Sequence, residues 1–344
     1  MRYQLGSYFT EIIETNFTQG LELIPQDSVF IIDQTVAGLY PAINAHSTTR
    51  MLIEADEANK DLKTAEKIFS WLQGKKANRN TTIVAVGGGI TTDLAGWVAA
   101  NYMRGCHLIF IPTTLVGMID AAIGGKTAIN FHQTKNLIGS FYPAEKVMII
   151  PELLRTLPEK EHLAGLAELI KMALLPDSNI LKFLNKLNDE SQKELKKLIM
   201  LSIDQKMKIC NIDLHDKGER RILNLGHTFA HVIESATDYQ ISHGRAVAIG
   251  IVKAARMSYI QELINKDRYD FIIDLMSGCF PAGYLKLDKI AVDSILKTGR
   301  KFYENDKKSK LILFAGEDNI YIANTIEWSK FKDILISEIS LEEK

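Results

Sequence analysis

The segment RRILNLGHTFAH, residues 220–231, gathers side chains that could bind a metal ion or an anion. If it forms one helix, four polar side chains share one face at positions i, i+4, i+7 and i+11: Arg220, Asn224, His227 and His231. Apolar residues flank this stripe, and burying its charged and amide groups without partners would be costly. The spacing therefore predicts a ligand or metal site rather than a solvated helix face.

Other residues could complete a metal site. Their spacing alone would nominate His227 and His231 as the two imidazole ligands. His243 opens the next helical segment, SHGRA, and Glu168 in GLAELIK supplies a carboxylate, with Lys171 nearly one turn further on. One carboxylate with two or three imidazoles suits Zn²⁺ or a similar divalent ion with open coordination positions. The spacing does not decide between His231 and His243 as a ligand.

Two glycine-rich segments could hold phosphate groups. VGGGITTDLAG, residues 86–96, follows an apolar run and opens a helical one, so its backbone N–H groups could face a pyrophosphate. Position 92 is Thr, which breaks the GxGxxG fingerprint, and a tight strand-to-helix connection is the alternative. The second segment, GGKT, resembles the end of a P-loop, but Asp120 stands where the first glycine would be. We interpret GGKT as a turn that presents Lys126 to a phosphate group without ATP hydrolysis. The alternative is that Lys126 is a surface lysine after a flexible turn.

The sequence pattern predicts two domains. Over residues 1–150, β-rich runs alternate with helical patterns, which predicts an α/β nucleotide-binding domain with a mostly parallel sheet. Expected strands cover residues 29–33, 50–54, 82–86 and 108–111, and expected helices cover residues 62–72 and 92–101. Residues 151–344 predict an all-α domain that binds metal and substrate, with helices such as 190–212 and 246–263. One late hairpin strand is expected at residues 311–314.

Composition excludes several classes of protein. The 344 residues include 41 Lys and Arg and 42 Asp and Glu, so the chain has no excess of positive charge that would favour binding to nucleic acid or to a membrane surface. Three widely separated cysteines make no disulfide framework and indicate a reducing cytoplasm. No stretch approaches the roughly 20 apolar residues that span a bilayer. We expect a cytoplasmic protein whose partner is a small molecule.

Together these segments resemble the 3-dehydroquinate synthase family of sugar-phosphate cyclases, from about Asp33 to Lys308. The motifs that carry the resemblance are GGGITTDLAGWVAA, MRG, PTTLVGMIDAAIGGKTAIN, KNLIGSFY, LRTLPEKE, GLAELIK, RRILNLGHTFAH, HGRAVAIG and DKK. The resemblance implies an N-terminal nucleotide-binding α/β domain, a helical C-terminal metal domain and a homodimer. It also implies a shikimate-pathway lyase that oxidises its sugar-phosphate substrate transiently with NAD, eliminates phosphate, returns the hydride and closes a carbocycle.

The resemblance assigns roles to individual residues. The ligands of Zn²⁺ or Co²⁺ would be Glu168, His227 and His243, so His231 would instead handle the substrate phosphate and a proton. NAD would contact Asp33, Glu57, Lys60, Gly88, Gly89, Asp93, Thr113, Thr114, Lys126, Lys135 and Thr156. Substrate would contact Asp120, Lys126, Lys135, Asn136, Lys171, Lys206, Arg220 and Asn224, with Arg104 from a neighbouring subunit and Lys307 or Lys308 completing the anion pocket.

Several positions near these residues depart from the family pattern, among them Ala121 and Ala122 in place of serines and Met172-Ala173 in place of Tyr-Gly. Asp216 stands where the family usually has Glu, and Arg245 replaces the acid of the HGE motif. Alternatives to the synthase are a sister cyclase resembling 2-deoxy-scyllo-inosose synthase or epi-valiolone synthase, and a metal-dependent polyol or glycerol-phosphate dehydrogenase that releases NADH. A scaffold without activity is the third alternative, and the retained Lys126, Glu168 and His227 disfavour it.

Overall fold

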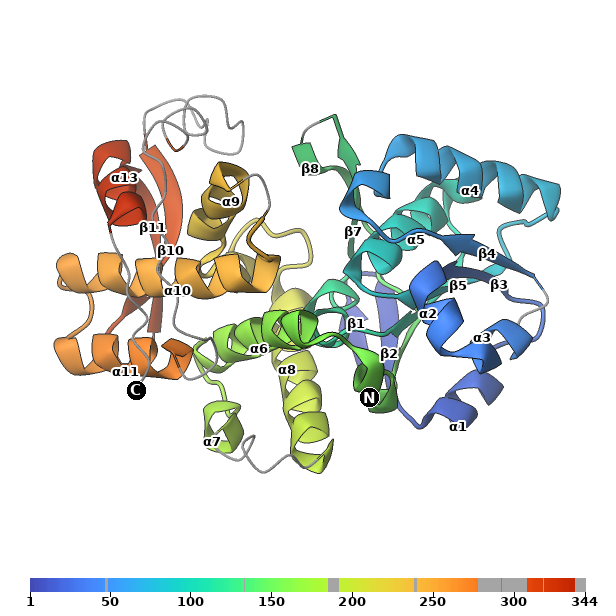
Figure 1. Cartoon of the computed structure of the whole chain (residues 1–344), viewed down its shortest axis with the longest axis horizontal. Coiled ribbons are helices and arrows are strands. Elements are labelled where there is room, and N and C mark those ends of the chain that lie inside the picture. The colour runs from blue at the N-terminus through green and yellow to red at the C-terminus, as the bar shows by residue number, and fades with distance from the viewer. Residues whose placement is uncertain are drawn as a thin grey trace. The chain divides into compact units, whose positions relative to one another are not determined.

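The computed structural model describes residues 1–46, 49–132, 134–184, 192–237, 240–277, 292, 308–317 and 319–337 (Figure 1). The chain divides into two compact units. The first comprises Met1–Pro158 and Glu190–Asp216, and the second comprises Glu159–Asp189 and Lys217–Lys344. An α/β architecture in the first unit and a mainly helical second unit agree with the predicted fold class.

A sheet of seven strands in the order β1-β2-β9-β6-β5-β3-β4 forms the centre of the first unit. The strands are β1 (Arg2–Leu5), β2 (Tyr8–Glu14), β3 (Val29–Asp33), β4 (Arg50–Ile53), β5 (Thr82–Gly87), β6 (His107–Pro112) and β9 (Lys146–Ile149). Only β1 pairs antiparallel; the other neighbours run parallel. The four predicted strands are confirmed within one or two residues. The apolar runs of β3, β5 and β6 are buried, whereas β4, at the edge of the sheet, is partly exposed.

Helices flank this sheet. They are α1 (Phe17–Glu22), α2 (Gln34–Leu39), α3 (Pro41–His46), α4 (Leu62–Gly74), α5 (Gly89–Asn101) and α8 (Gln192–Ile212), with short helical turns at Glu57–Asn59, Tyr102–Arg104, Gly117–Ala121 and Pro151–Thr156. In Figure 1, α4 and α5 lie above strands β3, β4 and β5, and α2 and α3 lie below them. Helix α5 begins at Gly89, three residues before its predicted start, because Gly88 takes the N-cap position.

A two-stranded antiparallel ribbon, β7 (Lys126–Phe131) and β8 (Thr134–Phe141), packs on α5. Gly96 permits this contact: a Cβ atom there would lie 2.4 Å from Cγ2 of Thr127. The sequence pattern does not predict this ribbon, because its strands are only partly buried and lack an unbroken apolar run.

The second unit is built around α10 (His243–Ile260). The other elements are α6 (Glu159–Ala173), α7 (Leu181–Leu184), α9 (His227–Ala236), α11 (Lys266–Ser277), α13 (Trp328–Ile336), a 3₁₀ helix (Glu219–Asn224) and the hairpin β10 (Lys308–Ala315) and β11 (Asn319–Glu327). Figure 1 shows α10 between α9 and α11, and it also packs on α6 and β10. Because neighbours cover it on several sides, most of its residues are buried.

The expected boundary at residue 150 differs from the division found in the structure. Helix α8 exists as predicted, but it belongs to the first unit, where it packs on β1 and the turn Gly117–Ala121. Lys206 Nζ on α8 lies 2.5 Å from Asp120 Oδ1, and Tyr3 donates a hydrogen bond of 2.9 Å to Asp204. The predicted helical second domain included a strand at 311–314, which is confirmed as part of β10, but not its partner β11.

The predicted continuous helix over residues 220–231 is wrong. The 3₁₀ helix ends at Asn224, and α9 begins at His227 after a break at Gly226, whose φ is +78°. A Cβ atom on Gly226 would lie 2.7 Å from Ile251 Cγ1 and 2.8 Å from Ile251 N on α10. Close packing on α10 therefore requires glycine in a left-handed conformation here, which ends one helix and starts another.

Two glycines of α10 bring it against its neighbours. A Cβ atom on Gly244 would lie 2.0 Å from Cα of Ala164 on α6, and one on Gly250 would lie 2.2 Å from the carbonyl oxygen of Gly226. The obstacles are backbone atoms, which cannot rotate away as a flexible side chain would. The starts of α9 and α10 and the middle of α6 are thereby held close together.

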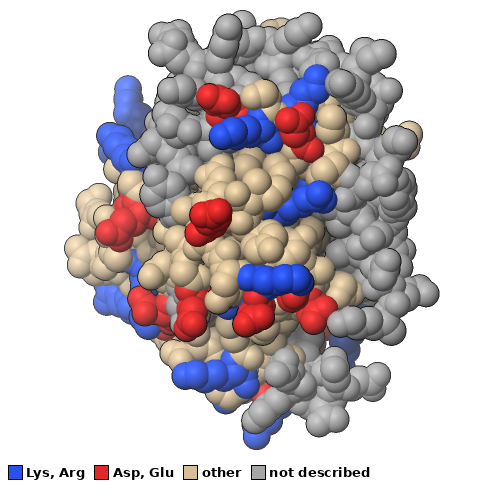
Figure 2. All heavy atoms as spheres, turned by 90° about the vertical axis from the view of Figure 1, so that its left-hand side faces the viewer, with Lys and Arg blue, Asp and Glu red and all other residues tan. Residues whose placement is uncertain are grey.

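No helix within the described ranges combines the length and the apolar character needed to cross a lipid bilayer. Figure 2 shows Lys and Arg interspersed with Asp and Glu on one face of the molecule, rather than gathered by sign. On α11, Lys266 Nζ lies 2.6 Å from Asp270 Oδ2.

We predict that Gly244→Ala destabilises the second unit by about 1–3 kcal/mol, since the added methyl group forces α10 away from α6. Thermal unfolding followed by circular dichroism measures the change. Gly74→Ala is the control, because nothing lies within 4 Å of a Cβ atom there, and it should be neutral or slightly stabilising. Equal melting temperatures for both variants would contradict the expected clash with α6.

Candidate metal and nucleotide sites

Three side chains from three helices of the second unit converge. Glu168 lies on α6, His227 is the first residue of α9 and His243 is the first residue of α10, and one ligand atom from each lies within 4.8 Å of the others. Oε1 of Glu168 is 3.4 Å from Nε2 of His227 and 3.4 Å from Nε2 of His243. One carboxylate oxygen and two imidazole nitrogens suit a tetrahedral divalent ion with a position left open for substrate.

The carboxylate of Glu168 is held in its charged form. Its side chain is 1% exposed, and Nζ of the equally buried Lys171 lies 2.6 Å from Oε2. Burial by itself would raise the pKa of Glu168, but Lys171 and the imidazole of His227 lower it well below its ordinary value. One oxygen of the carboxylate therefore faces the ammonium, and the other faces the two imidazoles.

Both imidazoles turn Nε2 toward Glu168 and Nδ1 away from it. Nδ1 of His227 lies 3.2 Å from the carbonyl oxygen of Leu225, and Nδ1 of His243 lies 3.4 Å from Oε1 of Glu234. Burial lowers the pKa of His243, but the two carboxylates beside it outweigh this and raise the pKa to about 10. A metal ion must therefore displace a proton from this ring.

Two residues of the predicted polar stripe, Arg220 and Asn224, are separated from this cluster by the break at Gly226. Arg220 is fully buried and Asn224 half-buried, both on the 3₁₀ helix before the break. His231 lies one turn beyond His227, with the two rings edge to face at 5.9 Å between centroids. The structure brings His243 rather than His231 together with Glu168 and His227.

In the first unit, several residues predicted to bind NAD follow the carboxyl ends of parallel strands. Asp33 ends β3, Gly88 and Gly89 follow β5, and Thr113 and Thr114 follow β6. The strand order reverses between β3 and β5, since β4 lies on one side of β3 and β5 on the other. In open parallel sheets a ligand binds beside such a reversal, outside the carboxyl ends of the strands.

A cavity of about 530 Å³ lies beside this edge. Its lining residues are Gln34, Thr35, Gly38, Leu39 and Glu54, which belong to α2 or directly follow β4. The side chain of the neighbouring Asp33 accepts a hydrogen bond of 2.8 Å from the backbone of Thr35 and so caps α2. A nucleoside of suitable size could enter this cavity beside the Asp33 carboxylate.

Lys60 joins two further predicted residues. Its buried Nζ lies 2.5 Å from Asp93 Oδ2 and donates a hydrogen bond of 2.6 Å to Asn136. Burial raises the pKa of Asp93, although the charge of Lys60 acts in the opposite direction. Lys135, beside Asn136 on β8, is half-buried.

Asn130 organises this group, and sequence reasoning gave it no role. Its side chain donates a hydrogen bond of 2.8 Å to Glu57 Oε1 and accepts one of 2.8 Å from the backbone of Asn136. Its own backbone N–H bonds the carbonyl of Lys60. An amide that both donates and accepts does not stand out in a sequence, whereas here it ties three predicted residues together.

Two predicted substrate lysines of the first unit are paired with carboxylates. Lys126 forms an ion pair with Asp216. Lys206 lies 2.5 Å from Asp120 Oδ1 and also donates to the Asp120 carbonyl. Each pair places an ammonium group beside a carboxylate. Such a pair could bind an anionic group through the ammonium and transfer a proton through the carboxylate.

The remaining predicted residues are more scattered. Arg104 is exposed with φ +67° in the turn after α5, and the hydroxyl of Thr156 lies 2.9 Å from that of Tyr40. Lys307 lies outside the described residues, and only the backbone of Lys308 is described, at the start of β10.

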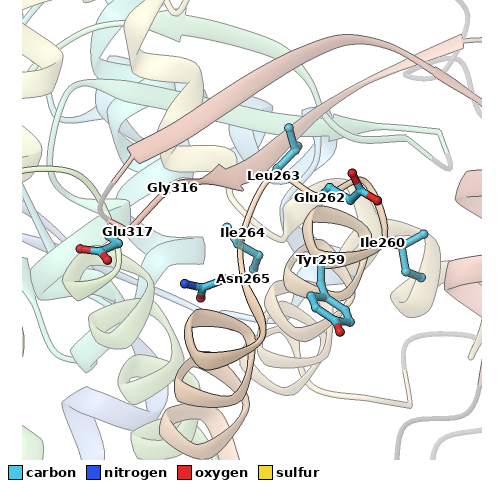
Figure 3. A pocket seen from close by; sticks show the side chains of 8 residues that line it. All are labelled: Tyr259, Ile260, Glu262, Leu263, Ile264, Asn265, Gly316 and Glu317. Carbon is cyan, nitrogen blue, oxygen red and sulfur yellow. The ribbon is translucent and has the colours of Figure 1, made fainter.

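A cavity of about 670 Å³ in the second unit holds none of the predicted residues. It is lined by Tyr259, Ile260, Glu262, Leu263, Ile264, Asn265, Gly316 and Glu317, from the end of α10, the following turn and the hairpin turn (Figure 3). The side chains in Figure 3 point in different directions instead of converging on one point. Chemistry needs convergent polar groups, so we do not assign the active site here.

The nucleotide-type sheet of one unit and the three-ligand cluster of the other define a class of proteins that combine a dinucleotide with a divalent metal ion. The chain belongs to the 3-dehydroquinate synthase family. The family models for the 3-dehydroquinate synthase N-terminal and C-terminal parts match residues 50–164 and 165–309, which confirms the resemblance inferred from the motifs.

Individual relatives agree with this family. The chain is 34% identical to a 3-dehydroquinate synthase of Tropheryma whipplei, with 94% of this chain and 95% of the relative covered. It is 38% identical to the 3-dehydroquinate synthase of Alkaliphilus oremlandii, with 85% and 80% covered. A solved 2-deoxy-scyllo-inosose synthase, complexed with carbaglucose-6-phosphate, NAD⁺ and Co²⁺, shares the fold at a TM-score of 0.86 and 25% identity, with 98% and 99% covered.

We predict that His243→Ala abolishes stoichiometric zinc binding, whereas His231→Ala retains it, because only His243 converges with Glu168 and His227. Elemental analysis after dialysis against a weak chelator measures the zinc content of each variant. Zinc loss from the His231 variant together with retention by the His243 variant would reverse the ligand assignment.

We predict that zinc binding to the metal-free protein at pH 8 releases about one proton from His243, whose pKa is raised to about 10. Because the ion competes with this proton, the apparent affinity should rise about tenfold from pH 7 to pH 8. Calorimetry in two buffers of different ionisation enthalpy measures the proton release. An affinity independent of pH would show that the ring is already neutral.

Proposed function

We propose that this protein converts 3-deoxy-D-arabino-heptulosonate 7-phosphate to 3-dehydroquinate and phosphate, as a lyase of the shikimate pathway on the route to chorismate and the aromatic amino acids. The observation that supports this most directly is membership of the 3-dehydroquinate synthase family over both halves of the chain. Curated synthases that are 34–38% identical over most of their length support the same substrate.

We assign the cofactors by residue. Glu168, His227 and His243 would hold Zn²⁺ or Co²⁺, and the charged carboxylate with two imidazole nitrogens fits either ion. The residues at the carboxyl edge of the sheet, with Lys60 and Asp93, would hold NAD. When bound, the ion would supply Lewis-acid polarisation of a substrate hydroxyl, and NAD⁺ would supply a reversible hydride acceptor.

The chain itself would bind and orient the anionic substrate. Lys171 and Arg220 are buried in the second unit, and their charges suit a substrate with a carboxylate or phosphate. Lys126 would bind a substrate oxyanion by exchanging its pairing with Asp216. Asp120, whose carboxylate lies against the ammonium of Lys206, could hold a proton while the lysine stabilises developing negative charge.

His231 has a separate role in this proposal. It lies one turn from His227, is half-buried and stands outside the ligand set, so it could move a proton at the leaving phosphate. Holding a single substrate against these groups would supply much of the rate, since the later ring closure joins two parts of the same molecule.

A sister cyclase is the second candidate, because a 2-deoxy-scyllo-inosose synthase shares the fold over nearly the whole chain. Such an enzyme would accept a sugar phosphate without a carboxylate. The higher identity to curated 3-dehydroquinate synthases favours the keto-acid phosphate. A homodimer, with Arg104 reaching the neighbouring phosphate site, and a cytoplasmic location stay predictions.

We predict phosphate release from the keto-acid phosphate with a catalytic amount of NAD⁺ and no accumulation of NADH. A coupled phosphate assay, run with and without a chelator and with absorbance read at the NADH wavelength, tests this. Phosphate release that needs the metal but not stoichiometric NAD⁺ supports the cyclase.

Glucose 6-phosphate and sedoheptulose 7-phosphate serve as the substrate controls. Turnover of either one in preference to the keto-acid phosphate would identify a sister cyclase. NADH accumulating in step with substrate oxidation would instead identify a dehydrogenase.

A further inference from the structure

We propose that Glu234 is a positioning residue that fixes the ring of His243 so that Nε2, and not Nδ1, faces the metal site. This inference rests on the proposed function only in that Glu168, His227 and His243 bind a divalent ion. The sequence motifs gave Glu234 no role, because its partner, His243, belongs to the next helix.

The burial of Glu234 calls for a partner. Its side chain is 5% exposed on α9, seven residues after His227. A carboxylate is costly to bury unless an opposite charge or a hydrogen-bond donor faces it. Oε1 of Glu234 lies 3.4 Å from Nδ1 of His243 on α10, so this acid and the imidazole face each other.

The orientation of the His243 ring shows what the contact with Glu234 can do. Nδ1 faces Glu234 while Nε2 lies 3.4 Å from Oε1 of Glu168, so the ring stands between two carboxylates from different helices. An acceptor at Nδ1 retains the proton there and leaves the lone pair on Nε2 for the metal. Carboxylates that accept from a metal-binding imidazole orient the ring and increase its basicity.

The two imidazoles differ in how strongly their surroundings fix the orientation of the ring. The side chain of His227 is 13% exposed, and its Nδ1 faces a backbone carbonyl, that of Leu225, at 3.2 Å. The side chain of His243, the first residue of α10, is 42% exposed. A more exposed ring has more rotational freedom, so its orientation depends more on a directional partner.

Two substitutions separate the acceptor from the charge. Glu234→Gln keeps the length and offers an amide oxygen to Nδ1, whereas Glu234→Met keeps a similar length and removes the acceptor. Asp270→Asn is the matched control, because it removes one negative charge from the same unit at a carboxylate that pairs with Lys266 on α11. Zinc affinity is measured by competition with a chromogenic chelator.

We expect Glu234→Met to weaken zinc binding by about 10–100-fold, Glu234→Gln to weaken it less, and the control to leave it unchanged. Histidine-selective nitrogen NMR of the zinc protein gives a readout that simple destabilisation would not change. The His243 ring should coordinate through Nε2 in the wild type and lose that single form in Glu234→Met. Thermal unfolding of the metal-free variants and NAD⁺ affinity check that the fold is retained.

Equal zinc affinity in the wild type and both Glu234 variants would overturn the inference, as would coordination through Nδ1 in the wild type. If Glu234→Met does not fold, the Gln variant and the wild-type NMR spectrum still decide between these outcomes. Zinc binding that weakens as expected in a protein that releases no phosphate would uphold the inference and refute the proposed function. A wild type that binds no zinc would refute both.

Discussion

The close approach of α10 to α6 and α9 is the constraint on which the metal cluster depends. Glycine at positions 244 and 250 places backbone against backbone, next to Ala164 and Gly226. Each contact lies within about two turns of a cluster residue: Ala164 precedes Glu168 by one turn, Gly226 directly precedes His227 and Gly244 follows His243. These small residues allow the three helices to approach closely enough for their side chains to bind one ion.

Electrostatics then determines the state of that cluster. Lys171 neutralises part of the buried charge of Glu168, and the opposite oxygen is left to the imidazoles. The first unit uses the same device, since Lys60, Lys126 and Lys206 each lie against a carboxylate. Pairing keeps these buried or partly buried charges in place at an acceptable free energy, and it also leaves cations close to where anionic groups are expected.

Sequence patterns predicted the regular parts of the fold well. Strand β3 begins and ends at the predicted residues, because a short apolar run bounded by polar residues is typical of a buried strand. The break at Gly226 was missed, since the need for a left-handed residue arises only from contact with Ile251, far along the chain. The choice between His231 and His243 was open for the same reason: helical spacing is local, whereas their convergence on Glu168 is not. The roles of Asn130 and Glu234 follow from partners that no local pattern reveals.

The chain leaves the first unit after Pro158 and returns to it for α8, from Gln192 to Ile212. On a ribosome, the strands of the sheet emerge well before this helix, with α6 of the other unit made in between. Residues that contact α8, such as Tyr3 and Asp120, cannot form these contacts until α8 has been synthesised. The longest-range contacts of this unit therefore form last. A fragment that stops at residue 158 would expose the surface that α8 covers, and it would be a substrate for chaperones rather than an independent nucleotide-binding module.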